Sequence, residues 1–170
     1  FVYRGRSVGG AVAPYGITFY GAVDDDSAAA FGEALRYVEA RVPARTPVPL
    51  MISSPGGDVY AALKMVDLME ASSLTFHTIA AGACMSAAAL VFSFGARRYV
   101  GPRATIMLHG VRMDFMEGKL KDVEVEATEM RRLNTMMWTL MSKNIGQDDE
   151  FLQNRLDARN TDCYFSPAAA

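Results

Sequence analysis

Residues 53–58, Ser-Ser-Pro-Gly-Gly-Asp, and residues 82–89, Gly-Ala-Cys-Met-Ser-Ala-Ala-Ala, each lie between a β-like run and a helical pattern. A third stretch, residues 106–109, reads Ile-Met-Leu-His and supplies one of only two histidines in the chain. Acyl transfer needs a hydroxyl nucleophile, an imidazole that takes its proton, and backbone N–H groups near the oxyanion. Glycine lets the backbone approach such a group closely. Together the three stretches contain what acyl transfer requires.

Around these stretches the apolar pattern alternates between short β-like runs and helical runs, which is typical of an α/β domain with a largely parallel sheet. A cluster of Asp and Ser side chains at residues 24–27 predicts a helix start, because these side chains accept bonds from first-turn N–H groups. We expect strands at residues 17–20, 47–52, 74–80, 99–100 and 105–109, and helices after residue 24 and at residues 60–71 and 84–95.

A long amphipathic helix is predicted at about residues 119–143, where apolar residues recur at spacings of three and four with charges on the other side. Lys143 and Gly146 are typical of its C-terminal end. Its apolar face, which includes Met130, Leu133, Met137 and Leu140, suits either packing against a second copy of the chain or ordinary packing within one chain.

Composition limits the classes of protein. The 170 residues are enough for one domain with its own core, and we expect a single domain over residues 1–170. Seventeen Lys and Arg against nineteen Asp and Glu give a net charge of −2 without a basic block, so nucleic acid is not an expected partner. The most apolar stretch, residues 80–96, is shorter than the ~20 residues of a membrane span, so no membrane association is expected.

The two cysteines, Cys84 and Cys163, lack the spacing of a zinc site. We therefore expect free thiols, and we expect neither a metal nor a cofactor. The expected location is the cytoplasm, or an organelle or the host cytoplasm if the protein is organellar or viral. Residues 1–6 lack the hydrophobic region of a signal peptide. Residues 168–170 resemble the start of another helix, so we expect a truncated C-terminus.

Each candidate residue also has an ordinary structural explanation. Ser86 could be a small residue in an Ala-rich helix, and His109 a structural histidine after an apolar strand. The other histidine, His77, lies within a predicted strand, and we interpret it as structural. Position favours Ser86, because the first turn of a helix after a strand exposes a side chain near unpaired N–H groups. Cys84 is the competing nucleophile, but buried cysteines are commonly inert.

The order of these motifs resembles the Clp protease proteolytic subunit family, including its phage and viral relatives. Residues 53–57 are similar to the family's Asn-Ser-Pro-Gly-Gly, residues 85–89 to its Ala-Ser-Met-Gly-Ala nucleophile segment, and residues 106–109 to its Ile-Met-Ile-His. Residues 118–147 are similar to its long handle helix and closing Gly-Gln. The resemblance implies a crotonase-like α/β fold, a spiral of βαβ units with a protruding handle helix.

The resemblance also implies a serine endopeptidase that cleaves unfolded polypeptides inside a homo-oligomer of stacked heptameric rings, a tetradecamer. It implies Ser86 as the nucleophile, His109 as the general base, and the backbone N–H groups of Gly57 and Ala87 as the oxyanion hole. The family's acid lies in an Asp-Thr-x-Arg-Asp segment. Asp157 fits the first Asp with a one-residue insertion and Asp162 fits the second, and we choose Asp157, with Asp162 as the alternative.

Partners and competing functions follow from the same resemblance. It implies an AAA+ unfoldase, although the N-terminal helix of bacterial members is not evident in residues 8–16. One competing function is an inactive structural ring subunit, against which the presence of both Ser86 and His109 argues. The other is a crotonase-type acyl-CoA hydratase or isomerase, which shares the fold but usually relies on carboxylates and does not need the Ser/His pair.

Overall fold

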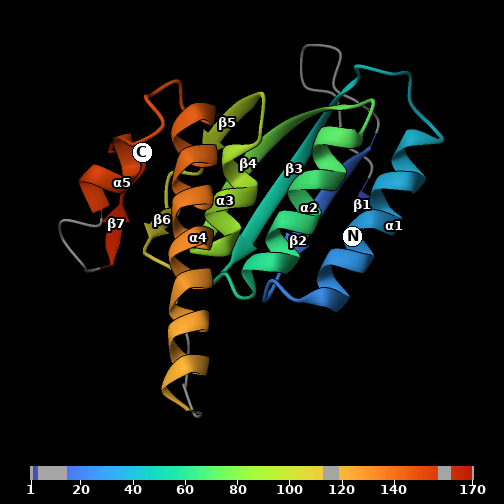
Figure 1. The fold of residues 1–170 in the computed structure, drawn as a ribbon. Helices are drawn as coiled ribbons and strands as arrows, with labels where there is room; N and C mark the ends of the chain where they lie inside the picture. Colours follow the sequence, from blue (N-terminus) through green and yellow to red (C-terminus); the bar gives the residue numbers. More distant parts are fainter. Residues whose placement is uncertain (1, 4–14, 113–118, 157–161, 170) are drawn as a thin grey trace. The chain divides into compact units, whose positions relative to one another are not determined.

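The computed structural model describes residues 2–3, 15–112, 119–156 and 162–169 (Figure 1). The chain forms two compact units, one of residues 1–107 with 164–170 and one of residues 108–163. The expectation of one domain over the whole chain stays a prediction. No described helix has the length and hydropathy needed to cross a membrane.

The first unit is built around a largely parallel sheet (Figure 1). Its strands follow the order β1-β2-β3-β4-β6-β7, and β5 also pairs with β4. The β2–β3, β3–β4, β4–β5 and β4–β6 pairs are parallel, whereas β1 pairs with β2 antiparallel. The predicted α/β class is therefore confirmed. The strands are β1 (Val2–Tyr3), β2 (Gly16–Tyr20), β3 (Pro47–Ser54), β4 (Thr75–Met85), β5 (Arg97–Val100), β6 (Thr105–Leu108) and β7 (Cys163–Phe165).

Three helices connect the parallel strands: α1 (Asp25–Glu39), α2 (Val59–Ala71) and α3 (Ala87–Ser93). In this row α1 contacts α2, and α2 contacts α3. The predicted helix start is confirmed, because the Asp24 side chain accepts from the Ser27 N–H at 2.7 Å and the Ser27 hydroxyl accepts from the Asp24 N–H. Asp58 caps α2 in the same way, accepting from the Ala61 N–H at 2.7 Å.

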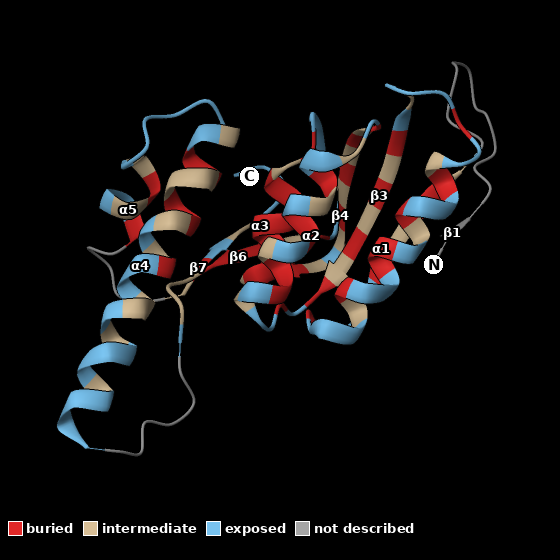
Figure 2. Ribbon diagram, turned by 45° about the vertical axis from the view of Figure 1, so that its right-hand side comes forward, coloured by how far each residue is buried: buried red, intermediate tan, exposed pale blue. Residues whose placement is uncertain are grey.

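The core of this unit lies between the helices and the sheet (Figure 2). Burial alternates strictly along β3, where Val48, Leu50 and Ile52 are fully buried and the residues between them are not. From α1, Phe31 and Leu35 face the same core. Because burying one such side chain contributes roughly 1.5–3 kcal/mol, this layer is the main source of stability for the turns at the strand ends.

The boundary between β4 and α3 differs from the prediction. A helix was expected from Cys84, but β4 continues to Met85 and α3 begins at Ala87. Cys84 pairs in register with Ser54 of β3 and with Ile106 of β6. Two ladders therefore hold the backbone of this segment in an extended conformation, and they override the helical propensity of its alanines.

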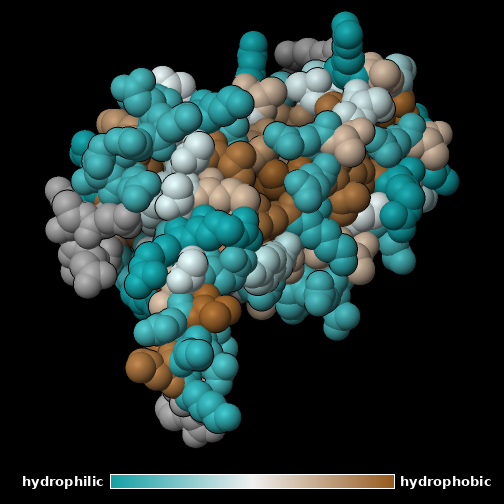
Figure 3. Space-filling model, viewed as in Figure 1, coloured by the Kyte–Doolittle hydropathy of each residue, from teal (hydrophilic) through white to brown (hydrophobic). Residues whose placement is uncertain are grey.

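The second unit contains α4 (Leu120–Asn144) and α5 (Phe151–Leu156), which contact each other. The predicted long helix is confirmed within one residue at each end. Leu133 and Met137 are each only 4% exposed, so the single chain already buries these two members of the apolar face. The exposed apolar side chains of α4 are instead Leu120 at 75% and Val125 at 69%, and hydrophobic atoms are visible along the first half of the helix (Figure 3).

Candidate active site

Ser86 occupies a strained turn between β4 and α3. Its backbone has φ 53° and ψ −126°, a conformation that residues with a side chain rarely adopt, and it is the N-cap of α3. It therefore lies one position before the helical first turn in which we expected it. Its N–H donates to the Met107 carbonyl at 2.8 Å, and its carbonyl accepts from the Ala89 N–H at 2.9 Å. Strained strand-to-helix turns of this kind present nucleophilic serines in hydrolases.

A glycine turn at the end of β3 packs against the Ser86 turn. A Cβ at Gly56 would lie 2.6 Å from the Met85 carbonyl oxygen, 2.7 Å from the Ser86 Cβ and 3.2 Å from the Ala87 nitrogen. The φ of Gly56 is +92°, which glycine alone adopts without strain. The Ser54 hydroxyl accepts from the Gly56 N–H at 3.1 Å and fixes the turn. Gly56 is therefore glycine because the Ser86 turn fills the space beside it.

Gly57 and Ala87 provide the N–H groups expected to form the oxyanion hole. Gly57 is exposed with φ +147°, and a Cβ there would clash with the backbone of Val23, to which Gly57 is bridged. Ala87 is the first residue of α3, so its N–H has no acceptor within the helix. Among the backbone hydrogen bonds that the described residues make outside helices and strands, neither N–H is a donor. The oxyanion-hole role of the two N–H groups stays a prediction.

Cys84, the competing nucleophile, is buried in β4. Its thiol donates to the Ala88 carbonyl at 3.7 Å, and burial raises the pKa of the Cys84 thiol to about 12. A thiol attacks as the thiolate, and this thiolate would be scarce near neutral pH. The local chemistry therefore favours Ser86.

His109 lies in the second unit, directly after β6, and is half-buried. Burial lowers the pKa of His109 below its ordinary value of 6.5, the charge of Arg112 lowers it further, and Asp162 raises it. The imidazole is therefore neutral near pH 7, which is the form that a general base requires. The other histidine, His77, lies in β4, where burial and Arg97 also lower its pKa.

The two candidate acids differ in what the structure says of them. Asp157 lies outside the described residues, so its role stays a prediction. Asp162 forms an ion pair with Arg112 and acts electrostatically on His109. The second unit thus brings together His109, Arg112 and Asp162.

Two neighbours of the site residues could not be anticipated from the sequence. Arg112 belongs to no recognisable motif, and it pairs with Asp162, which is 50 residues away in the sequence. Asn134 of α4 accepts from the Val111 N–H at 2.6 Å, and a Cβ at Gly110 would lie 3.3 Å from the same oxygen. Asn134 therefore fixes the backbone that follows His109. The only signal in the sequence is a polar residue within the apolar half of a helix.

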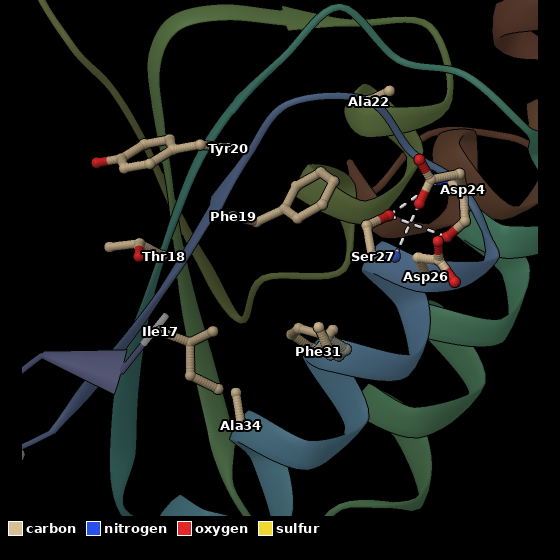
Figure 4. A pocket seen from close by; sticks show the side chains of 11 residues that line it. Ile17, Thr18, Phe19, Tyr20, Ala22, Asp24, Asp26, Ser27, Phe31 and Ala34 are labelled. Carbon is tan, nitrogen blue, oxygen red and sulfur yellow. Dashed lines mark hydrogen bonds between the residues drawn. The ribbon is translucent and has the colours of Figure 1, made fainter.

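A pocket of about 380 Å³ lies elsewhere in the first unit, between β2 and α1 (Figure 4). Figure 4 shows Phe19 and Phe31 turned toward its interior, whereas Thr18 points from the other side of the strand. The Asp24 carboxylate at its rim already caps α1. In the part of the chain that is described, no three His, Cys, Asp or Glu side chains gather as a metal site requires.

Comparison with known proteins places these features in a family. The sequence model of the Clp protease family matches residues 8–170. The ATP-dependent Clp protease proteolytic subunit 1 of Corynebacterium efficiens is 32% identical over 137 residues, which are 79% of this chain and 64% of that protein. The subunit 1 of Bifidobacterium longum is 31% identical over 79% of this chain and 58% of its own length. The subunit 2 of Mycobacterium leprae is 30% identical over 79% of this chain and 64% of its own length.

The matches therefore cover less than two thirds of the length of these relatives. The family model, in contrast, covers nearly all of this chain, including both glycine and serine turns, His109 and α4. A mostly parallel sheet with βαβ connections agrees with the crotonase-like fold that the resemblance implied. The chain belongs to the Clp protease family and has its α/β, crotonase-like fold.

Proposed function

We propose that this protein is a serine endopeptidase in which Ser86 is the nucleophile and His109 the general base. The observation that carries the proposal is the Ser86 turn, because it holds a non-glycine residue at φ 53° against a glycine turn at the end of the neighbouring strand. Such strain persists only where surrounding contacts enforce it, and it concentrates at functional sites. Family membership supports peptidase chemistry at this turn.

In the first step, neutral His109 takes the Ser86 hydroxyl proton as the serine oxygen attacks a peptide carbonyl. The Clp protease family model spans both the Ser86 turn and His109, which supports the pairing. The lowered pKa of His109 supports the role of base.

The attack places a negative charge on the former carbonyl oxygen, which the N–H groups of Gly57 and Ala87 bind. His109 then returns its proton to the leaving amine, and the peptide bond breaks to give an acyl-Ser86 ester and a free amino terminus. Water, deprotonated by His109, hydrolyses the ester and regenerates the enzyme. Losing one oxyanion donor typically costs 10²–10³ in turnover.

We further propose Asp162 as the acid that orients His109 and stabilises its protonated form. Its support is electrostatic, since Asp162 raises the pKa of His109 and so favours the imidazolium that forms during attack. Asp157, the acid chosen from the sequence, stays the alternative.

The assembly and the substrate belong to the same proposal. The relatives are named proteolytic subunits of an ATP-dependent protease, so this chain is proposed to act as a subunit of a ring-shaped homo-oligomer, with stacked heptamers as its form. Unfolded polypeptide is the proposed substrate, an AAA+ unfoldase the proposed partner and the cytoplasm the proposed location. The exposed apolar residues Leu120 and Val125 of α4 give the assembly a physical motive.

Labelling with an active-site-directed fluorophosphonate, followed by peptide mapping, tests the chemistry. We expect one modified residue, Ser86, and no labelling of Ser86→Ala. Cys84→Ala is the matched control two residues away, and it should label like the wild type. Labelling that is undiminished in Ser86→Ala would remove Ser86 from the mechanism. A wild-type protein that neither labels nor cleaves peptides would indicate an inactive structural subunit.

A further inference from the structure

Arg112 and Asp162 form an ion pair within the second unit, in which Arg112 donates from Nη2 to Oδ1 of the carboxylate. The Asp162 side chain is 28% exposed and the Arg112 side chain 61%. Ion pairs this accessible to solvent contribute little to stability, so stability does not explain the contact. Both members act on His109, with opposite signs. The pair is therefore part of the surroundings of the proposed base.

We propose that Arg112 is a positioning residue whose guanidinium holds the Asp162 carboxylate in the orientation in which it serves His109. The inference rests on the proposed function, in which His109 is the base and Asp162 its acid. Arginine suits this role because its rigid, planar donor group fixes the direction of a carboxylate. The carboxylate accepts from Arg112 through Oδ1, so the guanidinium fixes one of its two oxygens.

The backbone that carries Arg112 is itself held in place. The Val111 N–H donates to the Asn134 side chain of α4 at 2.6 Å. Gly110 packs on the same amide, from which a Cβ would be 3.3 Å away. The segment from His109 to Arg112 is thus fixed to a long helix, and Arg112 can orient a carboxylate from a defined position.

Arg112 and Asp162 are two charged groups that influence His109, and α4 presents the neutral Asn134 to the segment that follows His109. Arg112 therefore has two effects, an orienting one through Asp162 and a direct one through its charge. The two effects can be separated because only the first requires Asp162.

A double-mutant cycle read from the His109 pKa separates them without any need for activity. The chain has two histidines, so His77→Gln assigns the His109 resonance in an NMR titration of the full chain. Asp162→Asn should lower the His109 pKa in the wild-type background, and lower it by less than half as much in the Arg112→Gln background. An equal decrease in both backgrounds would overturn the proposal, because Asp162 would then reach His109 without help from Arg112.

Peptide hydrolysis provides the second readout. Arg112→Gln should reduce kcat about tenfold and change KM less than about twofold, because misplacing a catalytic group slows the chemical step. Arg112→Lys should recover part of the loss, and Arg112→Gln should cost nothing further once Asp162→Asn is present. A multiplicative loss, or an increase of kcat in Arg112→Gln, would refute the positioning role. If the wild type cleaves nothing, the proposed function fails, while the titration still decides the role of Arg112.

Discussion

Replacing Gly56 by alanine should disturb the Ser86 turn more than any other single added methyl group in the neighbourhood of the site. The new Cβ would lie 2.6 Å from the Met85 carbonyl oxygen and 2.7 Å from the Ser86 Cβ, closer than carbon atoms in folded proteins pack. Gly56 is buried, and the atoms it would meet are backbone or attached directly to it. The nucleophile turn would have to move.

The magnitude has two parts. A residue with a side chain at φ +92° costs on the order of 1–3 kcal/mol of backbone strain. Overpacking adds about 1–3 kcal/mol. Gly21 is a matched control, because its φ is +99° but nothing lies within 4 Å of an added Cβ. Gly21→Ala therefore incurs the first cost alone, and the difference between the variants isolates the contact with Ser86.

Urea unfolding and the rate of fluorophosphonate labelling measure the two consequences. Gly56→Ala should be about 1–3 kcal/mol less stable than Gly21→Ala. It should also label at least about tenfold more slowly, the factor that corresponds to 1.4 kcal/mol in a barrier. Gly21→Ala should label at the wild-type rate. Equal stability and equal labelling in the two alanine variants would refute the idea that Gly56 shapes the nucleophile turn.

Three further predictions follow from the second unit. Burial is the largest cause lowering the pKa of His109, so the neutral base should persist below pH 6.5. Activity should be lost only as the pH falls through the lowered pKa. In a pH profile of kcat/KM, an acid limb at or above pH 6.5 would contradict this prediction. Asp162→Asn should reduce peptide turnover by up to about 10⁴ and Asp157→Asn by only a few-fold, and the reverse ranking would return the acid to Asp157. Leu120→Asp with Val125→Asp should lower the particle mass in light scattering, and an unchanged mass would place the contact between copies elsewhere.

Elements that depend on local pattern could be predicted from the sequence. The cap of α1 was predictable because Asp24 and Ser27 satisfy N–H groups within three residues of each other. The long helix α4 was predictable because 25 residues repeat one apolar period. Ser86 and His109 could be singled out because their motifs occur in a specific order along the chain. Each of these signals is contained in a short stretch of residues.

Features that depend on distant partners could not be predicted. The Ala-rich run indicates a helix that begins at Cys84. Only the pairing of Cys84 with Ser54 and Ile106 keeps the chain extended to Met85, so the helix begins later. The burial of Leu133 likewise depends on what covers α4, which the period of its apolar residues does not reveal. The Arg112–Asp162 pair joins residues 50 positions apart, and no motif in the sequence links them.

The conformation of Ser86 shows why the second group matters for function. A serine at φ 53° is not stable by itself, so other parts of the chain must enforce it. Its N–H is held by the Met107 carbonyl of β6, and the turn at Gly56 at the end of β3 packs against its Cβ. Both neighbours come from strands adjacent to β4, 21 and 30 residues away in the sequence. The sheet therefore does more than carry the proposed nucleophile. It supplies the contacts that keep the Ser86 turn strained, so a change at Gly56 should alter reactivity while Ser86 itself is intact.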